Sequence, residues 1–405
     1  MKEQTVKIYK KTGRWLLDII KWIVLLSKAA TFRDSHLWIV YLLPVGGLMI
    51  VGLYKLMKVD KDKGTNLVLT SISGKDELPF KMAPLIFLST VISHFFGASV
   101  GREGAALQLG GSLGNTIGES FGFRECDRKI LIMTGMSAAF SALFGTPAAA
   151  AVFAVEVAVI GTMYIQALLP CVIAAYTASR LPLAIGIKPE RLPLGNVPDM
   201  SFVLILKLVV LAGLCGVLAI VFCVVMKKTK KYSEKLIKNP WLRVVAGAAV
   251  FIGITALTRS TDYYGTGMNV IERAVTEGEA VPYAFALKLV LTALMLGVGF
   301  KGGEIVPTFF VGATFGCVIG KLLGISPGLA AAAGMASLFC GVTNCPFAAA
   351  IMCFELFGFE SAPYILIVTA ISYAVSGYCS LYSGQYCDVS KYSLKMGDTG
   401  ENTDN

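Results

Sequence analysis

Uninterrupted apolar stretches of membrane-spanning length dominate the chain. Residues 38–54 read WIVYLLPVGGLMIVGLY, and residues 202–226 read FVLILKLVVLAGLCGVLAIVFCVVM. Such stretches approach or exceed the roughly 20 apolar residues with which a helix crosses a bilayer. The pattern predicts two pairs of spans, at about 14–34 and 37–57 and at about 202–226 and 242–258. We therefore expect an all-α polytopic membrane protein.

Further apolar segments are short and interrupted by glycine. They lie at about residues 64–72, 97–118, 302–324 and 334–358. A helix that stops inside a bilayer leaves backbone N–H groups unpaired, which is tolerated only where those groups line a cavity. The start of such a helix carries partial positive charge and binds anions. The pattern therefore predicts broken and re-entrant helices whose starts form an anion site.

Composition agrees with a membrane protein, and charge indicates its orientation. Hydrophobic residues make up 55% of the 405 residues and charged residues 15%, against about a quarter charged in soluble domains. The net charge of +10 is concentrated in the N-terminal segment and in residues 55–63 and 227–243. Such blocks are typical of cytoplasmic loops rather than of nucleic-acid surfaces. We expect a multi-pass protein of the inner or plasma membrane, with cytoplasmic termini, no cleavable signal and no nucleic-acid partner.

The sequence contains no motif of an enzyme, a cofactor site or a metal site. The ten cysteines are scattered without paired spacing and are expected to be core residues. His94, one of two histidines, lies in an apolar helix and is expected to be a buried core residue. The segment 110–114, GGSLG, matches the nucleophile elbow of hydrolases, but no histidine follows it. We expect no enzymatic activity, no cofactor and no bound metal.

An internal repeat relates the two halves of the chain. Residues 135–161 (GMSAAFSALFGTPAAAAVFAVEVAVIG) resemble residues 334–358 (GMASLFCGVTNCPFAAAIMCFELFG). QLGGSLG at 108–114 similarly matches FVGATFG at 310–316, and GTNLV at 64–68 matches GMNVI at 267–271. The basic segments lie at the outer ends of the first pair of spans but in the middle of the second pair. The halves therefore have inverted topologies, an arrangement in which transporters bind substrate near the midplane.

The repeat also divides the chain. We expect a first half at 1–190, a second half at 191–386 and a polar, disordered tail at 387–405, with the halves joined through the Pro-containing segment 186–200. The halves are not expected to be separate domains, because neither could bury its apolar faces alone.

One carboxylate stands out in SHFFGASVGREGAALQLGG, residues 93–111. Glu103 lies at a predicted helix start between Gly101 and Gly104, and the flanking sequence is apolar. An ionisable residue at membrane depth is expected to be functional. A carboxylate here can occupy the anion site itself, and its protonation would admit the substrate anion. This hypothesis couples proton movement to anion movement.

Three other acids and a tyrosine are candidates with different roles. Glu304, in the repeat's counterpart of the Glu103 segment, suits a proton relay, with a structural partner of Lys301 or Arg102 as the alternative. Tyr382 could donate its hydroxyl to a bound anion or anchor the last span at the interface. Glu156 and Glu355 recur symmetrically and are expected to cap or pair helix ends.

These residues resemble the motifs of the CLC family of anion channels and anion/proton antiporters. GREG at 101–104 resembles the family's GREGP motif, which places Glu103 on the gating glutamate. GEIVP at 303–307 resembles GxFxP, and SLYSGQ places Tyr382 on the central tyrosine. The resemblance covers nearly the whole chain. It implies a CLC-type inverted-repeat fold, a homodimer with one pore in each subunit, and anion transport across the lipid bilayer.

Within that family, the fluoride/proton antiporter branch is the closer match. GREGA, GGEIVP and SLYSGQ are similar to this branch, and Glu304 falls on the glutamate of its GGE motif. The intracellular proton glutamate of chloride antiporters corresponds here to Val157. Two features depart from the branch: Leu67 stands where a methionine is usual, and Ile305-Val306 replaces Val-Thr.

The resemblance implies fluoride export in exchange for protons, with Glu103 as gate and proton carrier and Glu304 as a proton relay or anion-pathway acid. The residues implied to bind the anion are Gly64, Thr65, Asn66, Leu67, Gly101, Arg102, Gly104, Ala105, Gly303, Ile305, Val306 and Tyr382. A chloride channel or chloride/proton antiporter is the near alternative. A cation/proton exchanger would instead place its acids at helix C-terminal ends, and an intramembrane enzyme would need a nucleophile–base pair.

Overall fold

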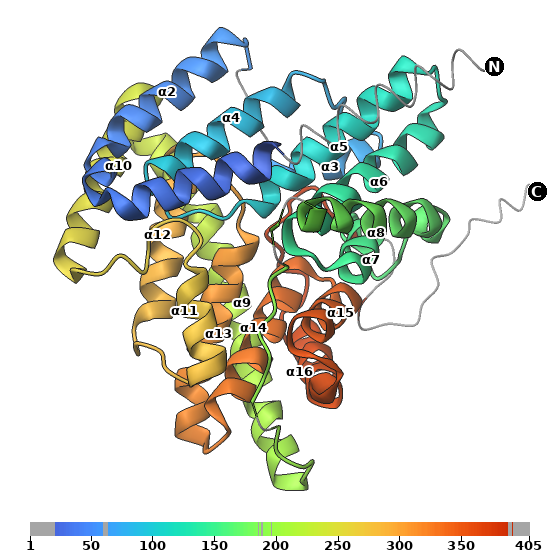
Figure 1. The fold of residues 1–405 in the computed structure, drawn as a ribbon, viewed down its shortest axis with the longest axis vertical. Coiled ribbons are helices and arrows are strands. Elements are labelled where there is room, and N and C mark those ends of the chain that lie inside the picture. Colours follow the sequence, from blue (N-terminus) through green and yellow to red (C-terminus); the bar gives the residue numbers. More distant parts are fainter. Residues whose placement is uncertain are drawn as a thin grey trace, which may run out of the picture.

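The protein is a bundle of helices of very different lengths (Figure 1). The computed structural model describes residues 21–59, 64–184, 186–187, 189–195, 197–387 and 391. The start of the predicted first span and most of the predicted C-terminal tail lie outside these residues.

Both halves contain a similar series of elements. After a helix at residues 21–35, the first half contains η1 (Leu37–Leu42), α2 (Leu43–Leu56), α3 (Thr65–Ile72), α4 (Met82–Phe95), α5 (Glu103–Ser120), α6 (Glu125–Phe144), α7 (Pro147–Glu156), β1 (Val159–Ile160), η2 (Ile165–Ala167) and α8 (Leu168–Ala184). The second half contains α9 (Phe202–Leu236), α10 (Pro240–Thr258), α11 (Met268–Glu272), η3 (Arg273–Glu277), α12 (Ala284–Val298), α13 (Ile305–Leu323), α14 (Pro327–Thr343), α15 (Pro346–Phe357), η4 (Phe359–Ser361), α16 (Ala362–Val375) and β2 (Tyr386–Cys387).

The long apolar helices agree with the predicted spans and add others. The prediction at 37–57 corresponds to η1 with α2, and that at 242–258 corresponds to α10. The helix predicted at 202–226 continues through the basic segment to Leu236 as α9. The segments Ile165–Ala184 and Ile305–Leu323 are also long and apolar enough to cross a membrane. The multi-pass membrane protein predicted from the hydrophobic pattern is confirmed.

Two helix crossings show the repeat in three dimensions. Helix α5 crosses α6 so closely that a Cβ on Gly110 would collide with the Gly135 carbonyl oxygen. In the second half α13 crosses α14 in the same way, with a Cβ on Gly312 lying 2.6 Å from the Gly334 oxygen. Glycine is needed at these positions because the backbone of the facing helix fills the space that a side chain would occupy. The segments matched in the sequence are therefore the ones that pack alike.

Glu156 and Glu355 each cap a helix of the opposite half. The Glu156 carboxylate at the end of α7 accepts hydrogen bonds from Phe347 N (3.1 Å) and Ala348 N (2.7 Å) at the start of α15. Glu355, near the end of α15, accepts from Ala148 N (3.1 Å) and Ala149 N (2.9 Å) at the start of α7. The capping role predicted from the repeat is confirmed. Because each helix caps the other's start, α7 and α15 are antiparallel.

Removing one of these caps is expected to lower stability. Glu355→Gln leaves an amide NH2 facing a backbone N–H, so one hydrogen bond is lost, at a cost of about 1–2 kcal/mol. Thermal unfolding of the detergent-solubilised protein measures the effect. Glu360→Gln, on the exposed η4 turn, is the control and should unfold like wild type. An unchanged melting temperature for Glu355→Gln would show that the caps contribute no stability.

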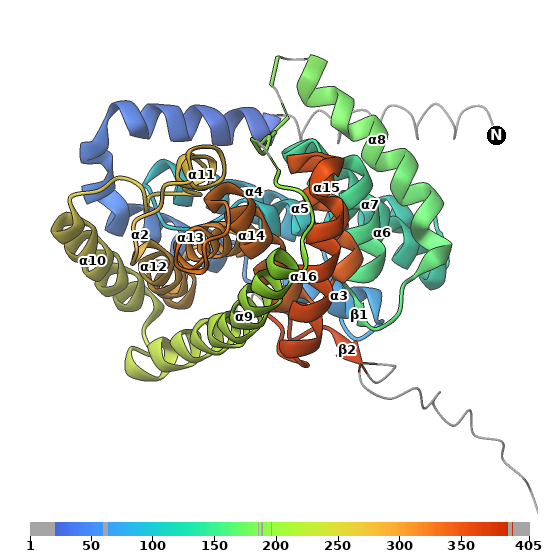
Figure 2. The ribbon, with the colours of Figure 1, turned by 90° about the horizontal axis from the view of Figure 1, so that it is seen from below.

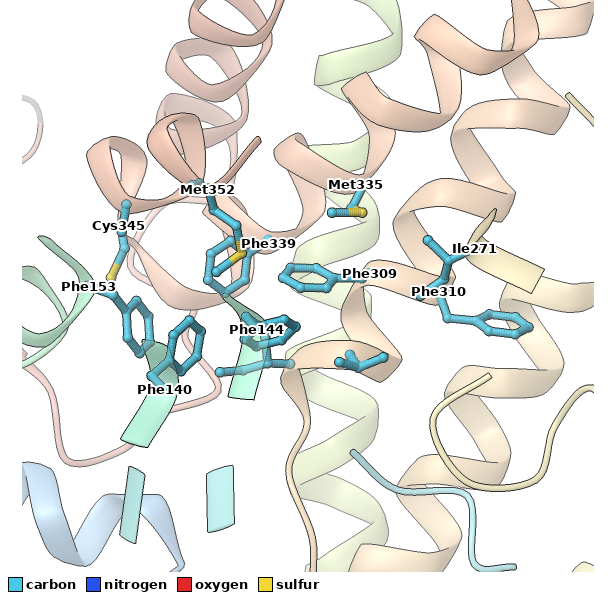
Figure 3. Close-up of a cluster of buried hydrophobic side chains, with 14 of the residues drawn as sticks. Phe140, Phe144, Phe153, Ile271, Phe309, Phe310, Met335, Phe339, Cys345 and Met352 are labelled. Atoms are coloured by element: carbon cyan, nitrogen blue, oxygen red, sulfur yellow. The ribbon is translucent and has the colours of Figure 1, made fainter. Parts of the chain in front are cut away.

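Phenylalanine rings join the two halves at the centre of the protein (Figure 3). Phe144 of α6 lies 5.9 Å, between ring centroids, from Phe309 of α13, and Phe153 of α7 lies 5.9 Å from Phe339 of α14. Phe309 and Phe339 meet edge-on at 5.0 Å, a favourable aromatic geometry. Each half therefore buries its apolar surface against the other.

The chain returns to the first half at its end. Strand β2 pairs in parallel with β1, so Cys387, assigned from the sequence to the tail, lies opposite Ile160. Just before the strand, Gly384 N donates to Asn66 Oδ1 at 2.9 Å, and Gln385 Nε2 donates to the Val157 carbonyl at 2.8 Å. The segment that carries Tyr382 is thus held against the start of α3.

Candidate functional site at three helix starts

The starts of α5 and α13 meet in an antiparallel backbone bridge. Gly101 N donates to the Gly303 oxygen at 2.7 Å, and Gly303 N donates to the Gly101 oxygen at 2.8 Å. A Cβ on Gly303 would collide with Gly104 N and lie 3.0 Å from Glu103 N. The glycines of the two motifs therefore permit one backbone to approach the other. Two helix starts, with their partial positive charges, point into one region.

Glu103 begins α5, but its carboxylate also reaches the start of α13. Its Oε2 accepts hydrogen bonds from Arg102 N at 2.9 Å and from Val306 N at 3.4 Å. The side chain is completely buried. Its Oε1 lies 3.6 Å from Arg102 Nε, beyond hydrogen-bond distance. The tethered carboxylate thus occupies a position where the α13 helix start offers its N–H groups to an anion.

The start of α3 joins the same place next to Gly104. A Cβ on Gly104 would lie 2.9 Å from Thr65 Oγ1, 3.0 Å from Gly303 Cα and 3.4 Å from Glu304 Oε2. Gly64, at the α3 N-cap, has a φ of +61°, a conformation that favours glycine. Three helix starts therefore converge, with the Glu304 carboxylate next to Gly104 and the Glu103 carboxylate next to Gly101.

A cavity of about 270 Å³ opens onto this convergence. Its wall includes Gly64, Thr65, Asn66, Gln108, Gly302 and Glu304 from the site, and Lys227, Lys230 and Lys301 from the basic side of the protein. Gln108 is 3% exposed, and its Oε1 accepts no hydrogen bond from any described group. The cavity is thus a basic entrance that attracts anions towards one acid, Glu304. The sequence did not single out Gln108, although it lies one turn after Gly104 on α5.

Tyr382 brings a phenol to the site. Its hydroxyl is buried and has no hydrogen-bond partner among the described residues. Glu304 and Glu103 are near enough to act on it electrostatically. Its backbone N donates to Ser380 Oγ at 3.0 Å. The preceding residue, Leu381, lines the cavity and is bonded through its N to the Val342 oxygen. A buried hydroxyl without a partner is free to donate a hydrogen bond to a group that enters the site.

Arg102, next to Glu103, forms an ion pair that the sequence did not predict. Arg102 Nη2 lies 2.6 Å from Glu190 Oε1. Glu190 belongs to the segment that joins the two halves, and nothing in its local sequence indicates a role at the site. Only its position in space reveals the contact.

The predicted site residues are not equally central. Six of them contact one another or the Glu103 carboxylate: Gly101, Gly104, Gly303, Glu304, Thr65 and Val306. Ala105 and Ile305 are fully buried in the first turns of α5 and α13. Asn66 lines the cavity but uses its side-chain oxygen to hold Gly384. Leu67 is only partly buried, and the described cavity wall does not include it.

Known proteins share both the sequence and the fold. The voltage-gated chloride channel family matches residues 46–377. A chloride/fluoride channel protein of Pseudomonas syringae pv. tomato is 36% identical over 374 residues, covering 91% of this chain and 82% of that protein. A voltage-gated ClC-type chloride channel of Salmonella typhimurium is 25% identical over 304 residues, 71% of each chain.

Solved structures agree with this assignment. The crystal structure of a CLC-type fluoride/proton antiporter has a TM-score of 0.89 and 33% sequence identity, and the match covers 95% of this chain and 98% of that one. A slow cyanobacterial Cl⁻/H⁺ antiporter, at 19% identity and a TM-score of 0.73, shares the fold over 92% of this chain and 91% of that one. With its inverted repeats and converging helix starts, the chain belongs to the voltage-gated chloride channel (CLC) family, whose members are channels or antiporters and not enzymes.

Proposed function

We propose that this protein exports fluoride from the cell in exchange for protons. The observation that carries the proposal is the position of the Glu103 carboxylate, which is tethered to α5 yet accepts a hydrogen bond from Val306 N at the start of α13. A fluoride ion bound at that helix start would need the same N–H group. Carboxylate and anion therefore compete for one place. Protonation removes the charge of the carboxylate and lets the anion replace it.

Glu304 and Glu103 occupy different positions on the proposed transport pathway. Glu304 lines the basic cavity, while Glu103 is completely buried beyond it. The cavity lysines raise the local anion concentration, and Glu304 is positioned to exchange protons with water in the cavity. Thr65 and Tyr382 supply hydroxyl groups for an ion that holds its hydration shell tightly. The anion thus exchanges water for backbone N–H and hydroxyl donors.

Two observations favour fluoride over chloride as the transported ion in this proposal. The structural relative at 33% identity is a fluoride/proton antiporter, and the Pseudomonas relative is a chloride/fluoride channel protein. By the family resemblance, Val157 corresponds to the intracellular proton glutamate of chloride antiporters, and a buried valine cannot carry a proton. Ile305-Val306, which replaces the Val-Thr usual in the fluoride branch and lacks its hydroxyl, counts in the other direction. Chloride transport is the competing outcome of the following test.

Anion efflux from liposomes decides between the two ions. We expect reconstituted protein to release fluoride at least about tenfold faster than chloride. This ratio corresponds to a difference of about 1.4 kcal/mol in the activation free energy of transport. Protons should move in the opposite direction. An ion-selective electrode and a pH electrode record both fluxes at once, and protein-free liposomes are the control. Chloride release as fast as fluoride release would exclude a fluoride transporter, and fluoride release without proton movement would exclude an antiporter.

The assembly and orientation follow from the family resemblance and the charges. We infer a homodimer in which each subunit has its own pore. Light scattering on the purified protein in detergent should give a protein mass twice that of one chain. The basic end of α9 is assigned to the cytoplasm by the positive-inside rule, and both termini with it. Because α9 spans the membrane, the segment before Phe202 then lies on the outer face.

A further inference from the structure

The segment that joins the two halves makes more contacts than a simple connection requires. It runs from the end of α8 to the start of α9, and Figure 2 shows it crossing the molecule between these helices. Its described residues have no regular structure. A segment that only connects α8 to α9 needs to be long enough to reach from one to the other. Specific contacts along it therefore indicate a further role.

Four consecutive residues of this segment contact the rest of the protein. Pro189 lies against Gly145 at the end of α6, where a Cβ would come 3.1 Å from the proline Cα. Glu190 pairs with Arg102. Arg191 Nη1 donates to the Glu355 oxygen, and Leu192 N donates to the Leu356 oxygen at 2.9 Å. The contacts on either side hold Glu190 in place beside the start of α5.

Arg102 lies between two carboxylates at unequal distances. Its Nη2 is 2.6 Å from Glu190 Oε1, a short charge-assisted hydrogen bond. Its Nε is 3.6 Å from Glu103 Oε1, which is too long for one. The Arg102 and Glu190 side chains are 19% and 24% exposed, so solvent screens this pair only partly. Glu190 Oε2 is buried and has no hydrogen-bond partner among the described residues.

We propose that Glu190 is a positioning residue of the gate, which draws Arg102 away from Glu103. Among the described residues, Arg102 approaches two carboxylates, Glu190 and Glu103. Without Glu190, its guanidinium would turn to Glu103 and form a close ion pair. That pair would hold the gate in its charged form at the start of α13. The anion would then face a stronger competitor, and the gate would take up protons less readily. This inference rests on the proposed function and adds a determinant from outside both helix starts.

The closing experiment compares Glu190→Gln in two backgrounds. In otherwise wild-type protein, we expect fluoride turnover in liposomes to fall about tenfold and the apparent KM for fluoride to rise, the size expected when one close charge pair is gained. In the Glu103→Gln background, Glu190→Gln should change nothing, because the carboxylate that Arg102 would capture has lost its charge. Glu190→Asp should restore part of the turnover.

Asp199→Asn is the matched control. Asp199 lies in the same joining segment and forms no ion pair with any described residue of the site, so its replacement should leave fluoride flux unchanged. Two results would overturn the proposal: wild-type turnover and KM in Glu190→Gln, or an equal loss of flux in both backgrounds, which indicates a purely structural role. If Glu103→Gln itself retains proton exchange, the proposed function fails separately.

Discussion

Glu103→Gln is expected to abolish proton exchange while leaving passive fluoride flux. The amide cannot take up and release a proton, but it fills the same volume and can still turn away from Val306 N. Fluoride efflux from liposomes should therefore continue without alkalinisation or acidification. Its rate should no longer depend on an imposed pH gradient. Parallel recordings of fluoride and pH measure both effects.

The control for this variant comes from the same helix. Glu119, at the far end of α5, pairs with Arg128 at 3.2 Å on the protein surface. Glu119→Gln makes the same chemical change away from the site and should retain coupled exchange. A Glu103→Gln protein that still moves protons with fluoride would remove Glu103 from the mechanism, however close it lies to α13.

Gly303→Ala is expected to stop transport by separating the two helix starts. The new Cβ would collide with Gly104 N, and the hydrogen bonds between Gly101 and Gly303 prevent the backbones from moving apart to relieve the contact. A displacement of about 1 Å can cost about 10²-fold in rate at a site that depends on placement. Overpacking of this kind also destabilises by about 1–3 kcal/mol. Fluoride flux and the melting temperature should therefore both fall.

Gly253→Ala tests whether the loss is specific to the crossing. This glycine lies on α10, and a Cβ added to it would meet no atom within 4 Å. The substitution should keep wild-type flux and raise stability slightly, since alanine favours helix by about 1 kcal/mol over glycine. Full activity in Gly303→Ala would mean that the close backbone approach is not needed for the site.

Local sequence predicted where the short helices begin and which acids stand at their starts. Glycine-interrupted apolar segments indicated the short helices, and a charged residue in such a segment is costly enough to indicate function. This reasoning found Glu103 at the start of α5 and Glu304 at the start of α13. It succeeded because the cost of burying charge, and the freedom of glycine, are properties of a few neighbouring residues.

Contacts between residues far apart in the sequence were harder to predict. The repeat indicated that Glu156 and Glu355 cap helices, but not that each caps the opposite half. Glu190 was missed because its partner Arg102 is 88 residues away and its own segment resembles an ordinary polar loop. Leu67 was chosen by its match to a motif, whereas the cavity wall uses the three residues before it, 64–66. Such contacts depend on tertiary packing, which no local pattern records.

The contact between Asn66 and Gly384 has a consequence for biosynthesis. The two residues are 318 positions apart. At about 5–20 residues per second, the ribosome needs roughly 15–60 s to make the chain between them. During that time Asn66 has been synthesised, but the segment whose Gly384 N–H donates to its side-chain oxygen has not. The contact that holds the Tyr382 segment against α3 can therefore form only after nearly the whole chain has been made.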